Sequence, residues 1–538
     1  MKPINKYLQV LKQIFPLSLL YMVLYIQIIV CITNFSDYDF REMVIWLCWI
    51  PIGLIPFYIS KKKMFYYLFL CILFTDNFIN LSHWLLLKGD ITASSLFILI
   101  NTNFSESVEF MTLKGNYNLL LLLPFILLFI YALRKIPPSF NYKEGKYVLG
   151  IIMLSVLIYF SDNIIHQRFV RKAVPASTKA MVFFSQEIKT YNSLKKRNIK
   201  TVKALTDDSQ ARVFVLIIGE SCSRNHMSLY NYHRNTNVKL KNRKDIIVYD
   251  NVVSSHSNTI FSLGMMLSES DLENNIEIDN SVFLADIFHA AGFKTYWISN
   301  QSPLGVWDNA VYNMARLHDK VVYENKKANS SFESTLKASF DEVLFAPFKE
   351  ALSEKIKNKC IMLHLMGSHS SYAKRYPANF SCFNTDKDKV GKTVNTYDNS
   401  ILYNDFIMDS LLIILTQYAS NDTNTLYTAI YLSDHGENVY DENNNAGHDY
   451  TGSLPKSNVE IPFIVWLSPQ YINKYPSKSN TILNHKHKPF ISDGLFHAVL
   501  DLNHIQTYYF DRSKSVFHLN YNAKRKRILE DKMDYDLK

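Results

Sequence analysis

The sequence has few cysteines, and their scarcity excludes a disulfide scaffold. Only six occur among 538 residues. Three lie in long apolar segments, and the polar part of the chain holds the other three, Cys222, Cys360 and Cys382. At most one bridge can form among these three, so cysteine usage does not identify the redox compartment.

A concentrated positive charge is also lacking. The formal net charge is +10, but Lys and Arg are scattered, apart from residues 61–63 and a short run near the C-terminus. No nucleic-acid recognition motif accompanies the charge, which argues against the nucleic-acid-binding class. A mild positive excess is typical of a protein that faces lipid phosphates.

Long apolar runs are present, but only before residue 161. They cover residues 14–33, 43–59, 64–87, 119–133 and 148–160. Several approach the roughly 20 residues that cross a bilayer, whereas the last two need flanking residues to do so. Buried core helices are the alternative, but five such runs in 160 residues favour a five-helix transmembrane domain over residues 1–160.

The charges of the loops predict the orientation of these spans. Lysine and arginine follow the second and fourth runs, whereas Glu106 and Glu109 follow the third. The positive-inside rule therefore places the N-terminus in the cytoplasm and the chain after residue 161 on the outer side of the membrane. The first run has no small-residue cleavage site and is expected to be an uncleaved anchor. Residues 161–210 fit interfacial linker helices or a solvated linker.

Residues 211–538 alternate short apolar runs with helical patterns. Strands are predicted at 213–218, 295–298, 361–365, 426–432 and 461–466, and helices at 282–291 and 399–418. This alternation predicts an α/β domain with a largely parallel central sheet.

Polar side chains follow four of the predicted strands. The side chains concerned are Glu220, Asn300, Gln301, His369, Asp434 and His435. Active sites of open α/β sheets lie at the carboxyl ends of the strands. We therefore expect these residues to meet at one edge of the sheet.

This set of residues has the chemistry of a metal-assisted transferase. Glu220, Asp434 and His435 form an ordinary zinc ligand set, and Thr259 would add an oxygen at the open position. Zinc acidifies a coordinated hydroxyl, so a threonine alkoxide could attack phosphorus and form a phospho-threonine intermediate. Taken alone, a threonine in Ser-His-Ser-Asn-Thr is more typical of a helix cap or loop.

Three further histidines are candidates for contact with substrate. His369 and His448 could hold phosphate oxygens, bind a second metal ion or transfer protons. His364, inside an apolar strand, is more typical of a packed core histidine, and we keep it as a substrate-binding candidate.

Four ordered motifs carry a resemblance to a known family. They read VFVLIIGESCSRNHMSLYNYHRNTN, NVVSSHSNTIFSLGMML, LHLMGSHSSYAKRYP and YLSDHGENVYDENNNAGHDYTG. The sequence resembles, over nearly its whole length, the phosphoethanolamine transferases of Gram-negative inner membranes, within the alkaline phosphatase and sulfatase superfamily. The resemblance implies zinc ligation by Glu220, Asp434 and His435, with Thr259 as nucleophile and metal ligand. It also implies a phosphate-site histidine at His369 and a second-site histidine at His448.

The loop after the third apolar run resembles the family's donor site. Thr102 and Glu106 match positions that seat the lipid headgroup, whereas Ile98 replaces the expected asparagine. Solvated loop charges are the plainer interpretation of Glu106 and Glu109. The polar part of the chain has too few cysteines for the several disulfides of the lipid A-modifying members, which suggests a core-sugar-modifying subgroup.

The sequence thus predicts a monomeric membrane enzyme that moves phosphoethanolamine from phosphatidylethanolamine to lipopolysaccharide, on lipid A or a core sugar. One zinc ion is expected and a second is possible. A glycerol-phosphate transferase resembling lipoteichoic acid synthase and a non-catalytic membrane sensor are the alternatives. A sulfatase activity is disfavoured because Cys222-Ser223-Arg224 does not supply C/S-x-P-x-R.

Overall fold

The fold was analysed in a computed structural model of the chain. The structure describes residues 63–87, most of 119–135, a few positions between 153 and 185, and 202–537 with gaps at 207–209, 302–309, 325–339, 386–387 and 449–452. The chain divides into two compact units, and residues 187–538 make up most of the second. Each unit is described by itself.

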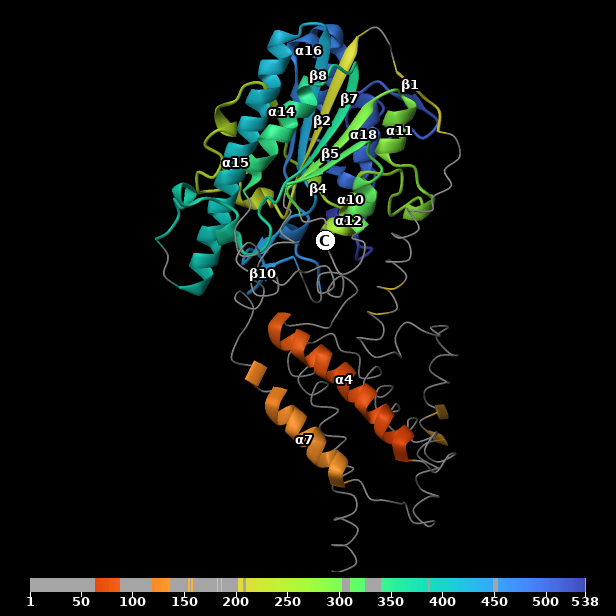
Figure 1. The fold of residues 1–538 in the computed structure, drawn as a ribbon, viewed down its shortest axis with the longest axis vertical. Coiled ribbons are helices and arrows are strands. Elements are labelled where there is room, and N and C mark those ends of the chain that lie inside the picture. The colour runs from red at the N-terminus through yellow and green to blue at the C-terminus, as the bar shows by residue number, and fades with distance from the viewer. Residues whose placement is uncertain are drawn as a thin grey trace, which may run out of the picture. The chain divides into compact units, whose positions relative to one another are not determined.

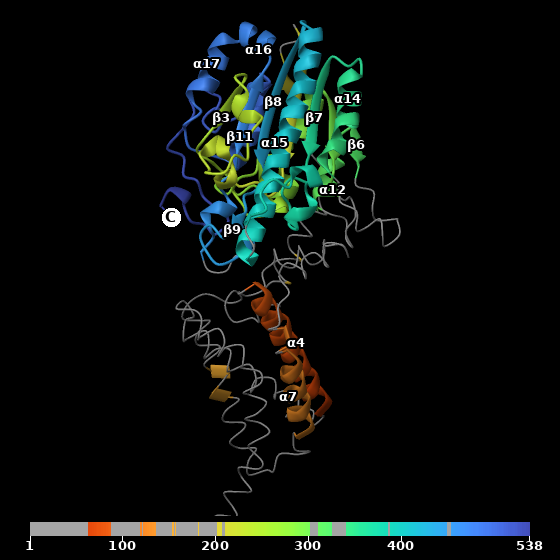
Figure 2. The same cartoon turned by 90° about the vertical axis from the view of Figure 1, so that its left-hand side faces the viewer.

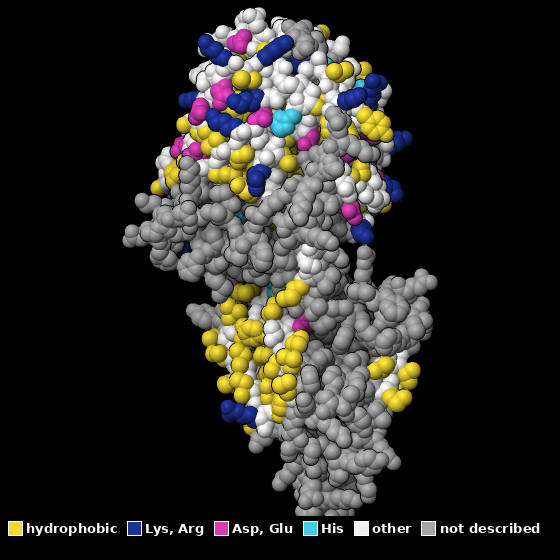
Figure 3. Space-filling view, turned by 45° about the vertical axis from the view of Figure 1, so that its right-hand side comes forward, with side chains coloured by type: hydrophobic (Ala, Val, Ile, Leu, Met, Phe, Trp, Pro, Cys, Tyr) yellow, Lys and Arg dark blue, Asp and Glu magenta, His cyan; other side chains and the backbone are white. Residues whose placement is uncertain are grey.

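Two helices represent the first unit in the described residues. They are α4 (Lys63–Leu87) and α7 (Leu122–Lys135), and the ring of Phe74 on α4 stacks against Phe125 and Phe129 of α7. Their outward residues include strongly exposed apolar side chains, drawn in yellow in Figure 3. Among the residues that the structure describes, no helix combines the length and the apolar character needed to span a membrane.

The five predicted spans are only partly covered by the structure. Predicted runs 64–87 and 119–133 overlap α4 and α7. Runs 14–33 and 43–59, nearly all of 148–160, and most of the predicted linker 161–210 lie outside the described residues. The five-helix bundle and the domain boundaries therefore stay predictions.

The second unit is built on a seven-stranded sheet of order β3-β11-β8-β2-β7-β5-β6. Its strands are β2 (Ala211–Gly219), β3 (Ile246–Tyr249), β5 (Lys294–Ser299), β6 (Lys320–Tyr323), β7 (Asn358–His364), β8 (Thr425–Ser433) and β11 (Phe463–Leu467). The five strands from β8 to β6 pair in parallel, as the alternating pattern predicts. The largely parallel sheet is confirmed.

One strand departs from the parallel arrangement. β11 pairs antiparallel with both β8 and β3, which makes the sheet mixed. The apolar run at 461–466 predicts a strand but carries no information about its direction. β3 and β6 were not predicted, because each has only four residues and is half-buried for most of its length.

Alternate residues of the central strand β2 point to opposite faces of the sheet. Phe214, Leu216 and Ile218 join one buried cluster. Val213, Val215 and Ile217 join the other. Burial on both faces explains why β2 reads as a continuous apolar run.

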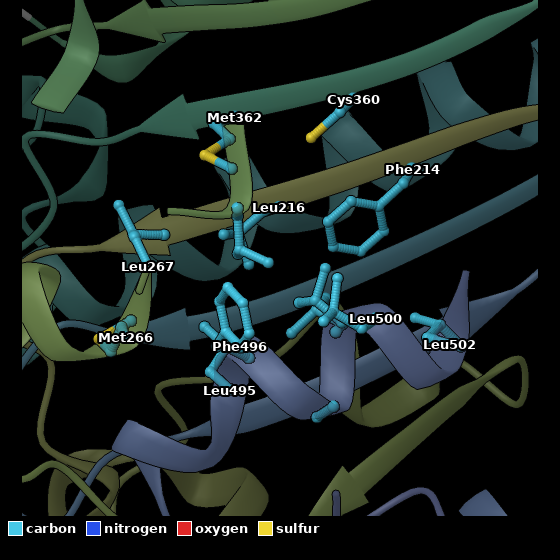
Figure 4. Packing of buried hydrophobic residues seen from close by; sticks show 14 of the residues in the cluster. Phe214, Leu216, Met266, Leu267, Cys360, Met362, Leu495, Phe496, Leu500 and Leu502 are labelled. Atoms are coloured by element: carbon cyan, nitrogen blue, oxygen red, sulfur yellow. The ribbon is translucent and has the colours of Figure 1, made fainter. Parts of the chain in front are cut away.

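Helices cover both faces of this sheet (Figure 1). One face carries α14 (Phe345–Ser353) and α15 (Lys389–Asn421), and α15 crosses in front of the sheet in Figure 2. The opposite face carries α10 (Thr259–Met266), α11 (Leu284–Ala290) and α18 (Leu495–Leu502). Figure 4 shows the core between α18 and the sheet, where Leu495, Phe496 and Leu500 of α18 face Phe214 and Leu216 of β2.

The remaining elements are short. They are α12 (Ala310–Ala315), α16 (Pro469–Lys474) and α17 (Pro476–Asn484), and the two-stranded pairs of β1 (Ala204–Leu205) with β13 (Gln506–Thr507), β4 (Val252–Val253) with β12 (Phe490–Ile491), and β9 (Asn438–Val439) with β10 (Ala446–Gly447). The pairing of β4 with β12 brings the chain that precedes α10 beside the C-terminal part of the molecule.

Helix boundaries show where the sequence pattern is weak. The predicted helix 282–291 is α11, and Gly292 ends it with φ +78°, a conformation that glycine adopts without strain. The predicted helix 399–418 is α15, which begins ten residues earlier at Lys389. The Asp388 side chain caps that end by accepting from the Gly391 N–H, and three of the first four residues of the helix are exposed.

Candidate active site

The carboxyl ends of β2 and β8 bring three possible metal ligands together. Glu220 follows β2, and Asp434 and His435 follow β8. All three side chains are at most 2% exposed, and each offers a ligand atom within 4.8 Å of the others. Parallel register explains the meeting, because Gly219 pairs with Ser433 at the end of the two strands.

The loop after β7 packs closely against Glu220. The Ser368 N–H donates to the Glu220 carbonyl oxygen at 2.9 Å. A Cβ atom at Gly367, where φ is +53°, would lie only 2.7 Å from that same oxygen. Glycine is therefore required here, both for the left-handed conformation and for the close approach.

Thr259 stands at the first residue of α10, beside these ligands. Its hydroxyl oxygen lies 3.2 Å from both Glu220 carboxylate oxygens and 3.5 Å from His435 Nε2. Asn258 caps the helix by accepting from the Phe261 N–H at 3.2 Å. The positive end of the helix dipole thus faces the region where a phosphoryl group would meet Thr259. Thr259 is half-buried, so a reactant can reach it, whereas Glu220, Asp434 and His435 are enclosed.

The hydrogen bonds of His435 leave one nitrogen directed at the cluster. Nδ1 lies 2.7 Å from the Gly436 carbonyl oxygen, which can only accept, so Nδ1 carries the proton of this bond. Nε2 faces Glu220 Oε1 at 3.4 Å and Asp434 Oδ2 at 3.6 Å. Asp434 Oδ2 has no hydrogen-bond partner among the described residues.

These distances fit a cation that is held by four ligands in a tetrahedral arrangement. Four zinc ligands at about 2.0–2.1 Å from the ion lie about 3.3–3.4 Å from one another. Four of the six separations among Thr259 Oγ1, Glu220, Asp434 Oδ2 and His435 Nε2 run from 3.2 to 3.6 Å, and the ligand atoms of Glu220 and Asp434 lie within 4.8 Å of each other. Together with the partnerless Asp434 oxygen, this spacing makes the residues suitable for zinc.

The pKa values report an excess of negative charge in the cluster. Burial, reinforced by the charge of Glu220, raises the pKa of Asp434 to about 7. Burial lowers the pKa of His435, but the charges of Asp434 and Glu220 outweigh it and raise that pKa to about 10. Burial raises the pKa of Glu220, but the hydrogen bond and charge of His435 hold it well below its usual range. The cluster therefore attracts positive charge, as protons or as a metal ion.

A second possible ligand group shares His435 and includes a residue that the sequence did not single out. His435, Glu437 and His448 also offer ligand atoms within 4.8 Å of one another. His448 Nδ1 lies 2.8 Å from Glu437 Oε2, and the rings of His448 and His435 are 4.5 Å apart. Glu437 accepts from the Tyr372 hydroxyl at 2.6 Å. Its position two residues after His435 was the only available signal.

The other candidate histidines lie in different environments. His369 is half-buried in the loop after β7, with Nδ1 3.3 Å from the Ser370 hydroxyl. His364, the last residue of β7, is 1% exposed beside Trp297, and its Nε2 is 4.0 Å from Glu220 Oε2. Burial lowers the pKa of His364 to about 4, so this ring is neutral, as a packed core histidine is.

Three observations complete the placement of the residues that the sequence analysis named. Gln301 follows β5, as expected, and its Nε2 donates to Glu220 Oε2 at 3.4 Å. Thr102 and Glu106, the predicted donor-site residues, lie outside the described residues. The described cysteines Cys71, Cys222, Cys360 and Cys382 are free, so none of them forms the bridge that composition allowed.

A sequence model of the Sulfatase family matches residues 212–505, which is more than half of the chain and includes all of the central sheet except Ala211. The chain belongs to the sulfatase family. Within the part matched to this family lie Glu220, Thr259, Asp434 and His435.

Curated relatives cover nearly the whole chain. Phosphoethanolamine transferase EptC of Escherichia coli K12 is 27% identical over 514 residues, which span 88% of this chain and 84% of the relative. Phosphoethanolamine transferase CptA of Salmonella typhimurium is 26% identical over 525 residues, spanning 91% and 89%. The resemblance found in the four motifs is thereby confirmed for this sulfatase-family chain.

Solved structures agree with the fold. The C-terminal periplasmic domain of EcEptC from Escherichia coli, in complex with zinc, is 28% identical, with a TM-score of 0.56 over 63% of this chain and 96% of that one. The integral membrane lipooligosaccharide phosphoethanolamine transferase A of Neisseria meningitidis is 21% identical, with a TM-score of 0.65 over 94% and 96%. At that identity the second likeness concerns the fold alone.

A buried ion pair holds the segment that follows Glu220. His226 Nδ1 lies 2.6 Å from Asp398 of α15, and Nε2 lies 3.1 Å from Asp441. Burial lowers the pKa of His226, but the hydrogen bonds to Asp398 and Asp441 outweigh it and raise that pKa to about 9. The segment is thus fixed to α15 by a protonated histidine.

This ion pair predicts a dependence of stability on pH. Because the folded-state pKa of about 9 exceeds the unfolded value, the stabilisation is complete below about pH 6.5 and is lost as pH rises through about 9. We expect the free energy of unfolding of the wild type, relative to His226→Gln, to fall by up to about 3 kcal/mol across that window. Denaturant unfolding at several pH values measures this free energy.

The exposed pair of His487 with Asp250 is a control, because the free energy of unfolding relative to His487→Gln should change little with pH. If the free energies of unfolding of the wild type and His226→Gln differed by the same amount at every pH, the protonated His226 ion pair would be contradicted.

Proposed function

We propose that the protein transfers phosphoethanolamine from phosphatidylethanolamine to a lipopolysaccharide acceptor, with Thr259 as the covalent nucleophile. The observation that carries this proposal is the position of the Thr259 hydroxyl. It is reachable at the start of α10, and it lies 3.2–3.5 Å from the buried Glu220 and His435. Similarity to EptC over 88% of the chain supports phosphoethanolamine as the transferred group.

Glu220, Asp434 and His435, together with the Thr259 hydroxyl, would hold the zinc ion. When bound, zinc supplies a Lewis acid that lowers the pKa of a hydroxyl and neutralises negative charge on a phosphoryl group. The tetrahedral spacing of these side chains and the zinc complex of the EptC domain support this choice of metal. Glu437 and His448 would complete a second site with His435 if a second ion binds.

The reaction would proceed in two displacements. In the first, Thr259 Oγ1 forms a bond to phosphorus, and the bond from phosphorus to the diacylglycerol oxygen breaks. The Thr259 hydroxyl gives up its proton, diacylglycerol leaves as an alcohol by gaining one, and phosphoethanolamine stays on Thr259. In the second, an acceptor oxygen of lipid A or a core sugar attacks the same phosphorus, the bond from phosphorus to Thr259 Oγ1 breaks, and Oγ1 takes up a proton to regain the hydroxyl.

The residues around Thr259 would orient both the nucleophile and the phosphoryl group. Glu220 accepts from the Thr259 hydroxyl, which fixes the direction of the lone pairs on Thr259 Oγ1. His448 is held through Nδ1 by Glu437 at 2.8 Å, which orients its ring for contact with a phosphoryl oxygen or for proton transfer to the leaving oxygen. His369 is half-buried and can play the same part from the loop after β7.

The proposal includes a location in the inner membrane, with the catalytic domain in the periplasm and the protein acting as a monomer. Its support is the loop charge asymmetry of residues 1–160 and the exposed leucines of α4 and α7, such as Leu68 (57%) and Leu127 (66%). Thr102 and Glu106 would seat the donor headgroup on the periplasmic side.

Analysis of lipopolysaccharide tests the proposed acceptor. Mass spectrometry of lipid A and core oligosaccharide should show added phosphoethanolamine in cells that carry the gene and lose it when Thr259 is changed to alanine. Addition to the core would place the protein in the core-sugar-modifying subgroup, and addition to lipid A would place it with the lipid A-modifying members. Unaltered lipid A and core in every strain would reject lipopolysaccharide as the acceptor.

A further inference from the structure

The loop that delivers Thr259 consists mostly of small polar residues, and its first four residues are buried. It runs Ser254-Ser255-His256-Ser257-Asn258 between β4 and α10. The reactivity of a nucleophile depends on its position to well below an ångström, since a shift of about 1 Å can cost roughly 100-fold in rate. Contacts from other segments must therefore hold this loop.

Three distant segments make hydrogen bonds to the loop. The Val459 carbonyl oxygen accepts from the Ser254 N–H at 2.7 Å, and the Ser492 hydroxyl accepts from the Ser255 N–H at 3.2 Å. Both contacts lie at the β4 end of the loop. The third comes from Glu530, near the end of the chain, and reaches further toward Thr259.

Glu530 contacts the loop at two points on either side of His256. Its N–H donates to the Ser255 carbonyl oxygen at 3.1 Å, and its carboxylate accepts from the Ser257 hydroxyl at 2.6 Å. Ser257 is 4% exposed and stands two residues before Thr259. A bond to an ionised acceptor is about twice as strong as a neutral one. The loop is thus fixed in both position and rotation just before the nucleophile.

The C-terminal segment, residues 525–537, is itself firmly held. Leu529 and Tyr535 are buried in a cluster with Val253 of β4. The Tyr535 hydroxyl donates to Glu460, and Arg527 pairs with Asp536. Glu530 therefore projects from an anchored segment, not from a loose end.

We propose that Glu530 is a positioning residue for the transfer reaction, holding the nucleophile loop through Ser255 and Ser257 so that Thr259 meets the phosphoryl group. The inference rests on the proposed function. Glu530 is 310 positions beyond Glu220, and no motif of the sequence analysis includes it. It acts through Ser257 and, within the described part of the chain, makes no hydrogen bond or ion pair with Glu220, Asp434 or His435.

The test measures the rate at which phosphoethanolamine becomes attached to Thr259. Full-length protein is mixed with phosphatidylethanolamine vesicles, quenched at short times, and the peptide that contains Thr259 is quantified by mass spectrometry. We expect Glu530→Ala to slow attachment roughly 10- to 100-fold, with KM, zinc content and melting temperature close to the wild type. Glu530→Gln keeps an oxygen acceptor for Ser257 and should restore most of the rate. Ser257→Ala should slow attachment by a similar factor. The double variant, Glu530→Ala with Ser257→Ala, should be no slower than either single variant, because both changes remove the same contact.

A matched control separates positioning from general loosening of the C-terminus. Glu273 pairs with Arg525 of the same segment at 2.7 Å and makes no contact with the nucleophile loop. Glu273→Gln should keep the wild-type rate. A Glu530→Ala protein at the wild-type rate, or a Glu273→Gln protein that is equally slow, would overturn the inference. Failure of the wild type to form any adduct would instead reject the proposed function.

Discussion

Replacing Thr259 with alanine should abolish turnover while leaving the fold and the zinc ion in place. The change removes the hydroxyl and one methyl group from a half-buried side chain at the start of α10, outside the buried core. Removing a covalent nucleophile should cost on the order of 10³-fold or more in kcat. Glu220, Asp434 and His435 still offer three buried ligands, so zinc content should stay near that of the wild type. Turnover of phosphatidylethanolamine to diacylglycerol measures the effect.

Thr259→Ser is the matched control for this prediction. It keeps a hydroxyl at the same helix position and loses only a methyl group, so the serine variant should form the adduct and retain measurable turnover. Diacylglycerol release by the alanine variant at the wild-type rate would contradict a covalent role for Thr259. Loss of zinc from Thr259→Ala would instead indicate that Thr259 serves mainly as a zinc ligand.

Replacing Asp434 with asparagine should remove the zinc ion and, with it, both activity and a large part of the heat resistance. Asp434 is fully buried, and its Oδ2 has no hydrogen-bond partner among the described residues, so the oxygen is suited to a cation. Loss of a direct ligand should exceed the roughly 10- to 100-fold loss of affinity that changes in outer-shell partners cause. Because zinc binds the folded state, wild-type protein should melt at a higher temperature with zinc, and the variant should lose this shift.

Glu437→Gln is the comparison that locates the tight ion. Glu437 belongs only to the group with His435 and His448, so this variant should keep the tightly held zinc and its melting shift. Metal analysis and calorimetry distinguish the two variants. Equal loss of zinc in both would contradict a site formed by Glu220, Asp434 and His435.

The sequence predicts the part of the site that follows from strand ends. Glu220, Asp434 and His435 each come directly after an apolar run, and parallel pairing carries such positions to one edge. Thr259 was placed by a motif resemblance and not by periodicity. The structure brings all four together, although their roles in catalysis stay proposals.

Other features depend on contacts that leave no local pattern. The direction of β11 is set by its neighbours, and an apolar run of five residues reads the same either way. Glu437 was missed because it lies in an irregular stretch after β8, where no period distinguishes a ligand from a solvated carboxylate. Glu530 was missed because its partner Ser257 is 273 residues away, and only the folded chain brings them together.

One measurement tests the central claim most directly. Full-length protein with zinc is incubated separately with phosphatidylethanolamine and phosphatidylglycerol, each labelled in its headgroup, and the peptide that contains Thr259 is examined. We predict label from phosphatidylethanolamine on Thr259, with release of diacylglycerol and transfer of the label to added lipopolysaccharide. Label from phosphatidylglycerol instead, or label on neither the peptide nor the acceptor, would contradict a phosphoethanolamine transferase that works through Thr259.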